Sequence, residues 1–267
     1  MRLATDLASE KGASTWLTSL PLEEHGFALH KSAFRDALCL RYGWQPQRLP
    51  SHCTCGSNFS VEHALSCNSG GFPLIRHNEL RDISASLLSE VCNQVSTEPT
   101  LQPLSGEALR GPANVADDAR SDISACGFWG GRFERTFFDV RVFNPFVRSN
   151  QTAQIATAYR RHEQQKRNQY ERRIREVDHS SFTPLVWSTS GGAGPSASVF
   201  LKRLASLLAD KKDQPYSVTM GWLRCRFGFA LLRSSIMCLR GARSRKSQPI
   251  FGHSHPVLAR AEGHFRL

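Results

Sequence analysis

Alternating apolar and polar positions predict two short strands within residues 121–145, joined by a glycine-rich connection. The first strand is expected at residues 122–128. The second is expected at residues 135–143, where β-branched and aromatic residues dominate. Residues 181–189 read as a further buried strand, and another is expected around residues 100–104. The pair at 121–145 is the segment around which the rest of the chain is organised.

Apolar residues spaced three or four apart predict helices over much of the remaining chain. They are expected at residues 30–42, 74–92, 151–177, 197–210 and 216–239. Gly43 follows the first of these helices, at the position where helices often end. The segment after Gly241 is rich in basic residues and is expected to be a disordered tail.

Asp139 and Arg141 are the charged residues inside the second strand. Because side chains alternate faces along a strand, Phe138, Val140 and Val142 can enter one apolar layer, while Asp139 and Arg141 share the opposite face about 7 Å apart. Hard cations such as Mg²⁺ bind carboxylate oxygens, and a bound cation can activate water and stabilise charge on a phosphate. Metal-assisted phosphodiester cleavage is the chemistry that would use this arrangement. The alternative is an exposed acid–base pair on the surface of a sheet.

The helix expected at residues 151–177 has an apolar stripe and a basic face. The stripe contains Ile155, Tyr159, Tyr170 and Ile174, and it also contains Lys166, which is costly to bury unless it is paired or lies at an edge. The other face carries more cations than solvation requires, so we expect it to contact a phosphate backbone. These cations are Arg160, Arg161, Arg167, Arg172, Arg173 and Arg175.

Three cysteines and one histidine cluster in the spacing C-x-C-x7-H-x3-C, formed by Cys53, Cys55, His63 and Cys67. A tight turn with two thiolates, closed by a histidine and a cysteine one helical turn apart, suits tetrahedral Zn²⁺. Four protein ligands leave no open position, so this zinc would be structural. The alternative is a set of buried cysteines without a metal.

The 267 residues carry a formal net charge of +11 and a pI near 9.6, which favours a polyanionic partner, nucleic acid ahead of a membrane surface. The eight cysteines do not form the framework of a small secreted protein, and this suits a reducing compartment. The first residues lack the apolar core of a signal peptide, and the longest apolar run, residues 227–239, is too short to span a bilayer. We therefore expect an intracellular protein that is not secreted and has no membrane partner.

Five segments, taken in order, resemble the C-terminal region of non-LTR retroelement polyproteins: CTCG…HALSC, GG…RHNELRD, DDARSDISACGFW…FFDVRVFNP, EQQKRNQYERR and SFTPLVWSTSGGAG. The resemblance covers residues 13–246. In that family a zinc knuckle precedes a restriction-endonuclease-like domain, which nicks target DNA to provide the primer end for reverse transcription. The resemblance implies an α/β fold of the PD-(D/E)XK nuclease type, with a mixed central sheet flanked by helices and preceded by a small helical region and a zinc knuckle.

Carried over by position, the resemblance implies that Asp122 and Asp139 bind a catalytic Mg²⁺ or Mn²⁺, and that Lys166 and Tyr170 form the downstream KxxxY element. One departure is important: Arg141 stands where the superfamily usually has lysine. Arginine can stabilise charge, but it cannot accept a proton at pH 7. We expect Lys166 to supply the missing amine from the helix and Arg141 to hold the scissile phosphate.

The expected domains are a helical leader at residues 1–50, a zinc knuckle at 51–72, a nuclease-like domain at 73–212, and a C-terminal helix with the basic tail at 213–267. No polymerase-like region fits before the knuckle, so we expect a fragment of a mobile element, or a gene derived from one, acting in the nucleus after synthesis in the cytoplasm. Two functions stay open. One is a Mg²⁺-dependent nicking endonuclease, and the other is a zinc-containing module or inert remnant that binds DNA, or also RNA, without cutting it. The target sequence and the oligomeric state are not indicated.

Overall fold

The structure is a computed structural model, and it describes residues 2–102, 120–151 and 154–242. By contacts between its residues, the chain forms two compact units. Unit 1 comprises Met1–Arg76, Thr189–Gly192 and Arg224–Leu267, and unit 2 comprises His77–Ser188 and Ala193–Leu223. The predicted basic tail after residue 242 lies outside the described residues.

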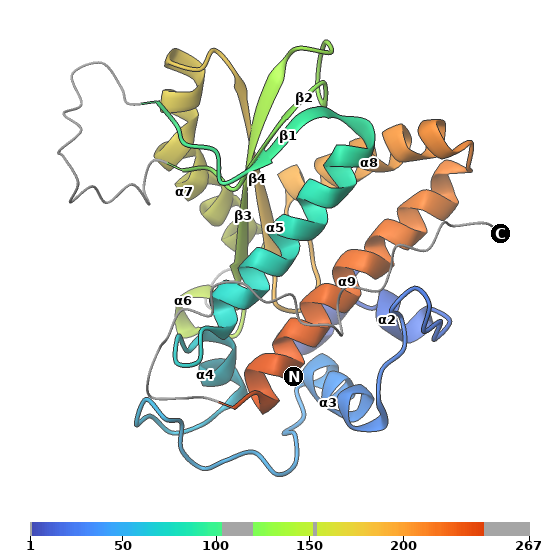
Figure 1. The fold of residues 1–267 in the computed structure, drawn as a ribbon. Helices are drawn as coiled ribbons and strands as arrows, with labels where there is room; N and C mark the ends of the chain where they lie inside the picture. The colour runs from blue at the N-terminus through green and yellow to red at the C-terminus, as the bar shows by residue number, and fades with distance from the viewer. Residues whose placement is uncertain (1, 103–119, 152–153, 243–267) are drawn as a thin grey trace. The chain divides into compact units, whose positions relative to one another are not determined.

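Unit 2 contains a four-stranded sheet in the order β1-β2-β3-β4 (Figure 1). The strands are β1 (Asn93–Thr97), β2 (Ile123–Cys126), β3 (Arg135–Phe143) and β4 (Ser181–Ser188). β1 pairs antiparallel with β2, and β2 pairs antiparallel with β3, whereas β4 pairs parallel with β3. The sheet is therefore mixed, and the predicted α/β class is confirmed.

Helices cover both faces of β3. The parallel pairing of β3 and β4 needs a crossover, which α7 (Ile155–Glu176) provides, and α8 (Pro195–Lys212) follows β4. On one face, Phe137 belongs to a core cluster with Tyr170 and Ile174 of α7. On the other face, the ring of Phe138 packs against that of Phe200 of α8, with 5.5 Å between ring centroids. Asp139 therefore lies in a strand that is buried on both sides, and it is not part of an exposed pair.

Two strands of the sheet differ from the sequence pattern. β1 was not predicted, because its sequence, NQVST, is polar and mostly exposed. The strand expected at residues 100–104 is reduced to a bridge between Thr100 and Arg120, and residues 103 and 104 lie outside the described part of the chain. β2 is shorter than expected, whereas β3 has the predicted bounds.

The other helices are α1 (Arg2–Ala8), α2 (Thr15–Thr18), α3 (Lys31–Tyr42), α4 (Val61–Ser66), α5 (Phe72–Val91), α6 (Arg148–Gln151) and α9 (Tyr216–Arg240). In unit 1, α3 ends at Gly43 in the left-handed conformation, as predicted. Asp36 of α3 forms a two-point ion pair with Arg240 of α9, at 2.6 and 2.7 Å. Of the described helices, none is long and apolar enough to cross a membrane.

Candidate functional site

The Cys/His group of unit 1 is formed by a tight turn and a short helix. In the turn, the backbone N–H of Gly56 donates to the carbonyl of Cys53, and Gly56 has a φ of 93°, which favours glycine. α4 then begins after Ser60, whose side chain accepts a hydrogen bond from the N–H of His63. Because Cys67 follows His63 by four residues, one helical turn brings both side chains to the same face.

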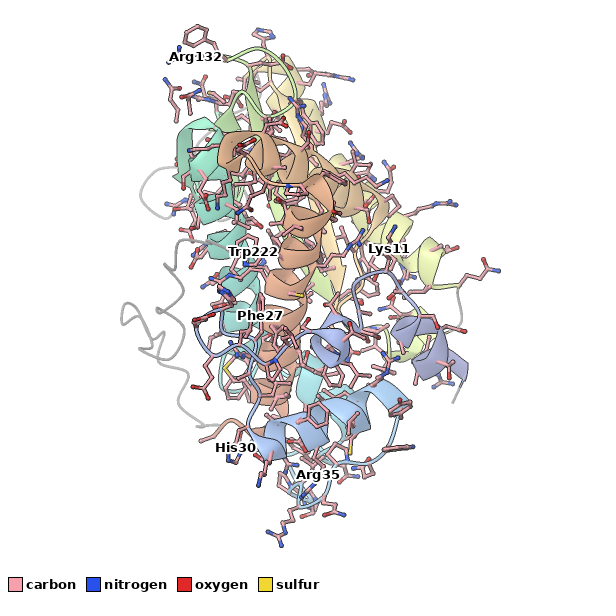
Figure 2. The ribbon with its side chains drawn as sticks, turned by 90° about the vertical axis from the view of Figure 1, so that its right-hand side faces the viewer. Lys11, Phe27, His30, Arg35, Arg132 and Trp222 are labelled. Atoms are coloured by element: carbon pink, nitrogen blue, oxygen red, sulfur yellow. The ribbon has the colours of Figure 1, made fainter. Side chains whose placement is uncertain are left out.

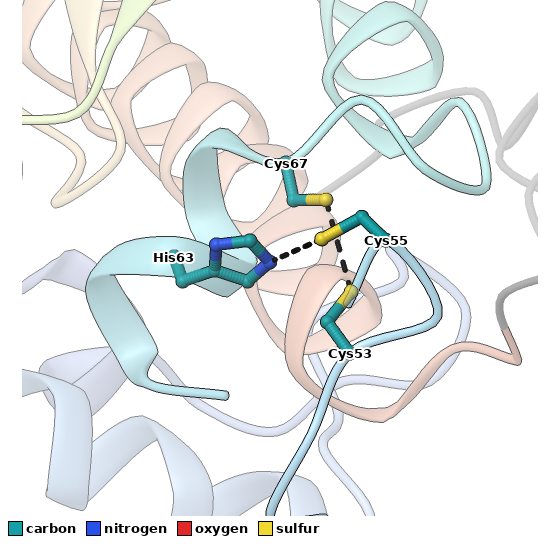
Figure 3. A group of neighbouring side chains, drawn as sticks. All are labelled: Cys53, Cys55, His63 and Cys67. Atoms are coloured by element: carbon teal, nitrogen blue, oxygen red, sulfur yellow. Dashed lines mark hydrogen bonds between the residues drawn. The ribbon is translucent and has the colours of Figure 1, made fainter. Parts of the chain in front are cut away.

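The four side chains point toward one another (Figure 3), and their ligand atoms all lie within 4.8 Å of each other. Sγ of Cys53 lies 3.8 Å from Sγ of Cys67, and Sγ of Cys55 lies 3.4 Å from Nε2 of His63. Zinc–sulfur bonds of about 2.3 Å in a tetrahedron place two sulfurs roughly 3.8 Å apart, so the spacing fits such an ion. This Cys₃His group could bind a metal such as zinc.

The cysteines of this group are free thiols in different surroundings. Cys53 is buried, Cys67 is half-buried and Cys55 is exposed, which is unlike a set of buried core cysteines. Hydrogen bonds from the side chain and backbone of Ser57 lower the pKa of Cys55 to about 6. The thiolate is the form that binds metal, so this hydrogen bonding favours coordination near neutral pH.

A second candidate site lies in unit 2, where β2 and β3 pair. Asp122 immediately precedes β2, and its Oδ2 accepts a 2.6 Å hydrogen bond from the backbone N–H of Val140 in β3. Its Oδ1 lies 3.0 Å from Nε2 of His77, on α5. Both carboxylate oxygens of Asp122 therefore have partners, which fix the orientation of this group.

Lys166, which the helix stripe placed on the buried face, lies next to Asp139. Nζ of Lys166 is 2.7 Å from Oδ2 of Asp139, and the side chains are 14% and 3% exposed. Nζ also lies 5.4 Å from the ring centroid of Tyr170, whose side chain is buried in the core of unit 2.

The electrostatics of Asp139 suit a cation. Burial and, next, the negative charge of Asp122 raise its pKa to about 6, whereas Lys166 and His77 lower it. Two carboxylates that repel each other offer the oxygen donors that Mg²⁺ or Mn²⁺ takes. Water and substrate oxygens would complete the coordination of such an ion.

Arg141 follows Asp139 by two residues in β3, and its charge acts on His162 of α7. Arg141 is exposed, and its side chain forms no hydrogen bond or ion pair with other described residues. Burial and, next, the positive charge of Arg141 lower the pKa of His162 to about 4, so this imidazole is neutral at pH 7. Its ring packs against Phe143 with 4.6 Å between centroids, and Nε2 has no hydrogen-bond partner among the described residues.

The side chain of Glu163, on α7, caps the start of the neighbouring helix α8. Its Oε1 accepts a 2.8 Å hydrogen bond from the backbone N–H of Ser196, and its Oε2 accepts one of 3.0 Å from the hydroxyl. A side chain at Gly194 would place its Cβ 2.8 Å from Oε1 of Glu163, so it would displace this carboxylate from the start of α8. These contacts fix α7 against α8, and thereby fix the helix that carries Lys166.

The basic face of α7 is partly neutralised. Arg167 and Arg172 pair with glutamates four residues later, at 3.1 Å each. Arg161 donates to the carbonyl of Ser149, and Arg173 also has a partner. Within the described residues, Arg160 and Arg175 are exposed, and their side chains form no hydrogen bond or ion pair. Fewer arginines on this face are therefore available to a phosphate backbone than the sequence indicates.

Sequence reasoning missed the roles of three residues in unit 2: His77, His162 and Glu163. The spacing along α7 offered a signal for two of them, since the predicted stripe passed from Tyr159 to Lys166 and skipped the turn between. A scan against protein-family models finds no match to this chain, and a search of curated proteins finds none either.

Proposed function

We propose that this chain is a metal-dependent DNA endonuclease that nicks DNA, derived from a non-LTR retroelement and acting in the nucleus. The observation that carries the proposal is the cluster formed by Asp122, Asp139 and Lys166 in a strand pair buried between helices. Its residue types and order match the PD-(D/E)XK pattern, with the amine supplied from α7. The Cys₃His group is proposed to bind a structural Zn²⁺.

Asp122 and Asp139 would hold Mg²⁺ or Mn²⁺, which would supply positive charge at the scissile phosphate and activate water. Asp122 is oriented for this role by the N–H of Val140 and by His77. Lys166 places its amine beside Asp139, where it can donate an N–H to the attacking water. Exposed Arg141 is available to a phosphate oxygen, where a guanidinium binds well.

DNA is the proposed substrate because the chain has a net charge of +11, and because Arg160 and Arg175 of α7 are exposed. Cations of this kind attract the phosphate backbone and release its counterions. RNA shares that chemistry and is a further candidate partner.

One observation favours a second function, a binding module without catalysis. The ammonium of Lys166 already lies 2.7 Å from Asp139, where it can replace the charge of a metal ion. With arginine at position 141 in place of lysine, a protein of this kind would keep its fold and its affinity for nucleic acid but would not cut. Binding is common to both functions, so only cleavage separates them.

The deciding experiment is nicking of supercoiled plasmid by the full chain with Mg²⁺ or Mn²⁺. The wild type should nick, and Asp139→Asn and Lys166→Met should each lower the rate by about 100-fold or more, the usual effect of losing an acid–base or charge-stabilising group. Arg141→Lys should keep or raise the rate. Asp210→Asn and Lys202→Met, at exposed positions of α8, are the matched controls and should leave nicking unchanged.

Binding measured in Ca²⁺ separates the outcomes. Asp139→Asn should bind DNA nearly as well as the wild type, because the substitution removes negative charge from a buried position and leaves the basic surface intact. If Lys166→Met nicks as fast as the wild type, the role given to Lys166 is wrong. If the wild type binds DNA but nicks with no divalent metal, the second function holds.

A further inference from the structure

The connection between β2 and β3 presents an aromatic ring to solvent. It comprises residues 127–134, between the paired residues Cys126 and Arg135. The ring of Phe133, near its end, is 83% exposed, more than any other large hydrophobic residue in the described part of the chain. Exposing such a ring has no benefit for folding, because burial of apolar area is what stabilises a domain.

The first half of this connection is firmly anchored. Phe128 is fully buried, and its ring packs against Phe138 and Phe200 with centroids 5.3 and 5.2 Å apart. Its carbonyl accepts a 3.0 Å hydrogen bond from Nε of Arg203. The indole N–H of Trp129 donates to the hydroxyl of Thr183 at 2.9 Å.

The second half closes in a tight turn. The N–H of Gly127 donates to the carbonyl of Glu134 at 2.9 Å, and the N–H of Glu134 donates to the carbonyl of Gly131 at 2.8 Å. The backbone that carries Phe133 is therefore part of a turn closed by hydrogen bonds at both ends of the connection.

Arginines flank the ring. The guanidinium of Arg132 lies 5.9 Å from the centroid of Phe133, in a cation–π contact, and Arg135 follows two residues later. Figure 2 shows Arg132 at the tip of the connection. A single ring between exposed cations is too small for a hydrophobic protein interface, which needs an apolar patch of several hundred Å². The same pairing of ring and cation suits a stacked base with its phosphate.

We propose that the β2–β3 tip is a DNA-contacting wedge, in which Phe133 stacks on a base or enters a base step and Arg132 contacts the adjacent phosphate. This inference rests on the proposed function, because it takes DNA as the partner. β3 carries Asp139 in the same compact unit, so the wedge would set which base lies near the candidate catalytic cluster. The wedge is thereby a positioning element for the nick.

The test is binding of the full chain to duplexes that carry 2-aminopurine at successive positions, in Ca²⁺ without Mg²⁺. The wild type should raise the fluorescence of the probe at one position, where the base is unstacked. Phe133→Ala should abolish this signal and weaken binding roughly 5- to 100-fold, as loss of one base–aromatic stack does, without changing the salt slope. Phe133→Trp should restore both. Arg132→Gln should lower the salt slope by about one.

Trp44→Ala is the matched control, since Trp44 is also an exposed aromatic residue, 58% exposed, and should change neither signal. If Phe133→Ala binds and unstacks DNA as the wild type does, the wedge is wrong, while the nicking assay still judges the endonuclease. If the wild type binds no DNA, the wedge is wrong as well. If sedimentation without DNA shows that Phe133→Ala removes self-association, the ring is an interface between copies and the proposal fails.

Discussion

Asp139 is expected to destabilise the metal-free protein near neutral pH, and Asp139→Asn should reverse the effect. The carboxyl group is 2% exposed, and burial followed by the charge of Asp122 raises its pKa to about 6, against an ordinary value of 3.8. Lys166 and His77 face the same group and lower its pKa, but they do not offset burial. Asparagine has nearly the same shape without the charge, so it keeps the packing and removes the cost of ionisation.

The direction and size of the effect follow from linkage. Because the pKa of Asp139 is higher in the folded state than in the unfolded chain, its contribution to stability is fully present below pH 4 and is lost as pH rises through about 6. A difference of about two pH units at 1.36 kcal/mol each corresponds to about 3 kcal/mol. At pH 8, Asp139→Asn should therefore be more stable than the wild type by up to about 3 kcal/mol, whereas near pH 4 the two should be similar.

Urea unfolding of both proteins between pH 4 and pH 8, in buffer without Mg²⁺, measures this difference. The pH effects of groups that do not interact with Asp139 cancel in it, whereas Asp122, Lys166 and His77 belong to the same coupled site. Asp210→Asn, at an exposed position, should follow the wild type at every pH. Mg²⁺ should then stabilise the wild type and not Asp139→Asn, because only a folded state that binds the ion gains from it. Equal stability of the wild type and Asp139→Asn at pH 8, or lower stability of the variant there, would refute the electrostatic account of this site.

Three further predictions concern other parts of the chain. Native mass spectrometry should show one bound zinc, and Cys55→Ser should weaken its binding. Chelation should speed hydrogen exchange in residues 50–70 while leaving the sheet protected. Freely modifiable thiols without bound zinc would contradict this prediction. Replacing Arg160 and Arg175 by glutamine should lower the salt slope of DNA binding by about two. Arg172→Gln should lower it by less, since Arg172 is paired with a glutamate. A flat salt dependence in the wild type would exclude phosphate contacts. Glu163→Gln should lower the free energy of unfolding by about 1–3 kcal/mol, because two hydrogen bonds to the start of α8 lose their charged acceptor, and an unchanged urea midpoint would contradict this.

The hairpin around Asp139 could be predicted because its sequence signals are local. The alternation of β3 and the glycines of its connection gave the antiparallel pair, and the apolar spacing of α7 placed Lys166 toward the sheet. The spacing of Cys53, Cys55, His63 and Cys67 likewise depends on one turn and one short helix, so the sequence is enough to bring these side chains together.

The partners of the carboxylates could not be predicted, because they depend on packing between distant segments. His77 meets Asp122 across 45 residues, and Glu163 meets Ser196 across 33. β1 has a polar sequence and is a strand because β2 pairs with it, so its own propensity gave no signal. The burial of Asp139 depends on α7, whose packing covers the face of β3 that the sequence left open to solvent.

The contact between Lys166 and Asp139 is compatible with a working metal site and also with a lost one. As an ion pair it offsets part of the cost of a buried carboxylate, and Asp122 adds to that cost. A metal ion would satisfy both carboxylates more fully and would free the amine to face the substrate, so the resting pair is an expected state of an active site. In a protein without catalysis, the Lys166–Asp139 pair would take the place of the metal ion, and Asp122 would have no metal to bind. Asp122 is held by Val140 and His77 in an orientation that a lysine–aspartate pair alone does not need. The proposed active site accounts for that orientation, because it requires the carboxylate of Asp122 to be fixed near Asp139.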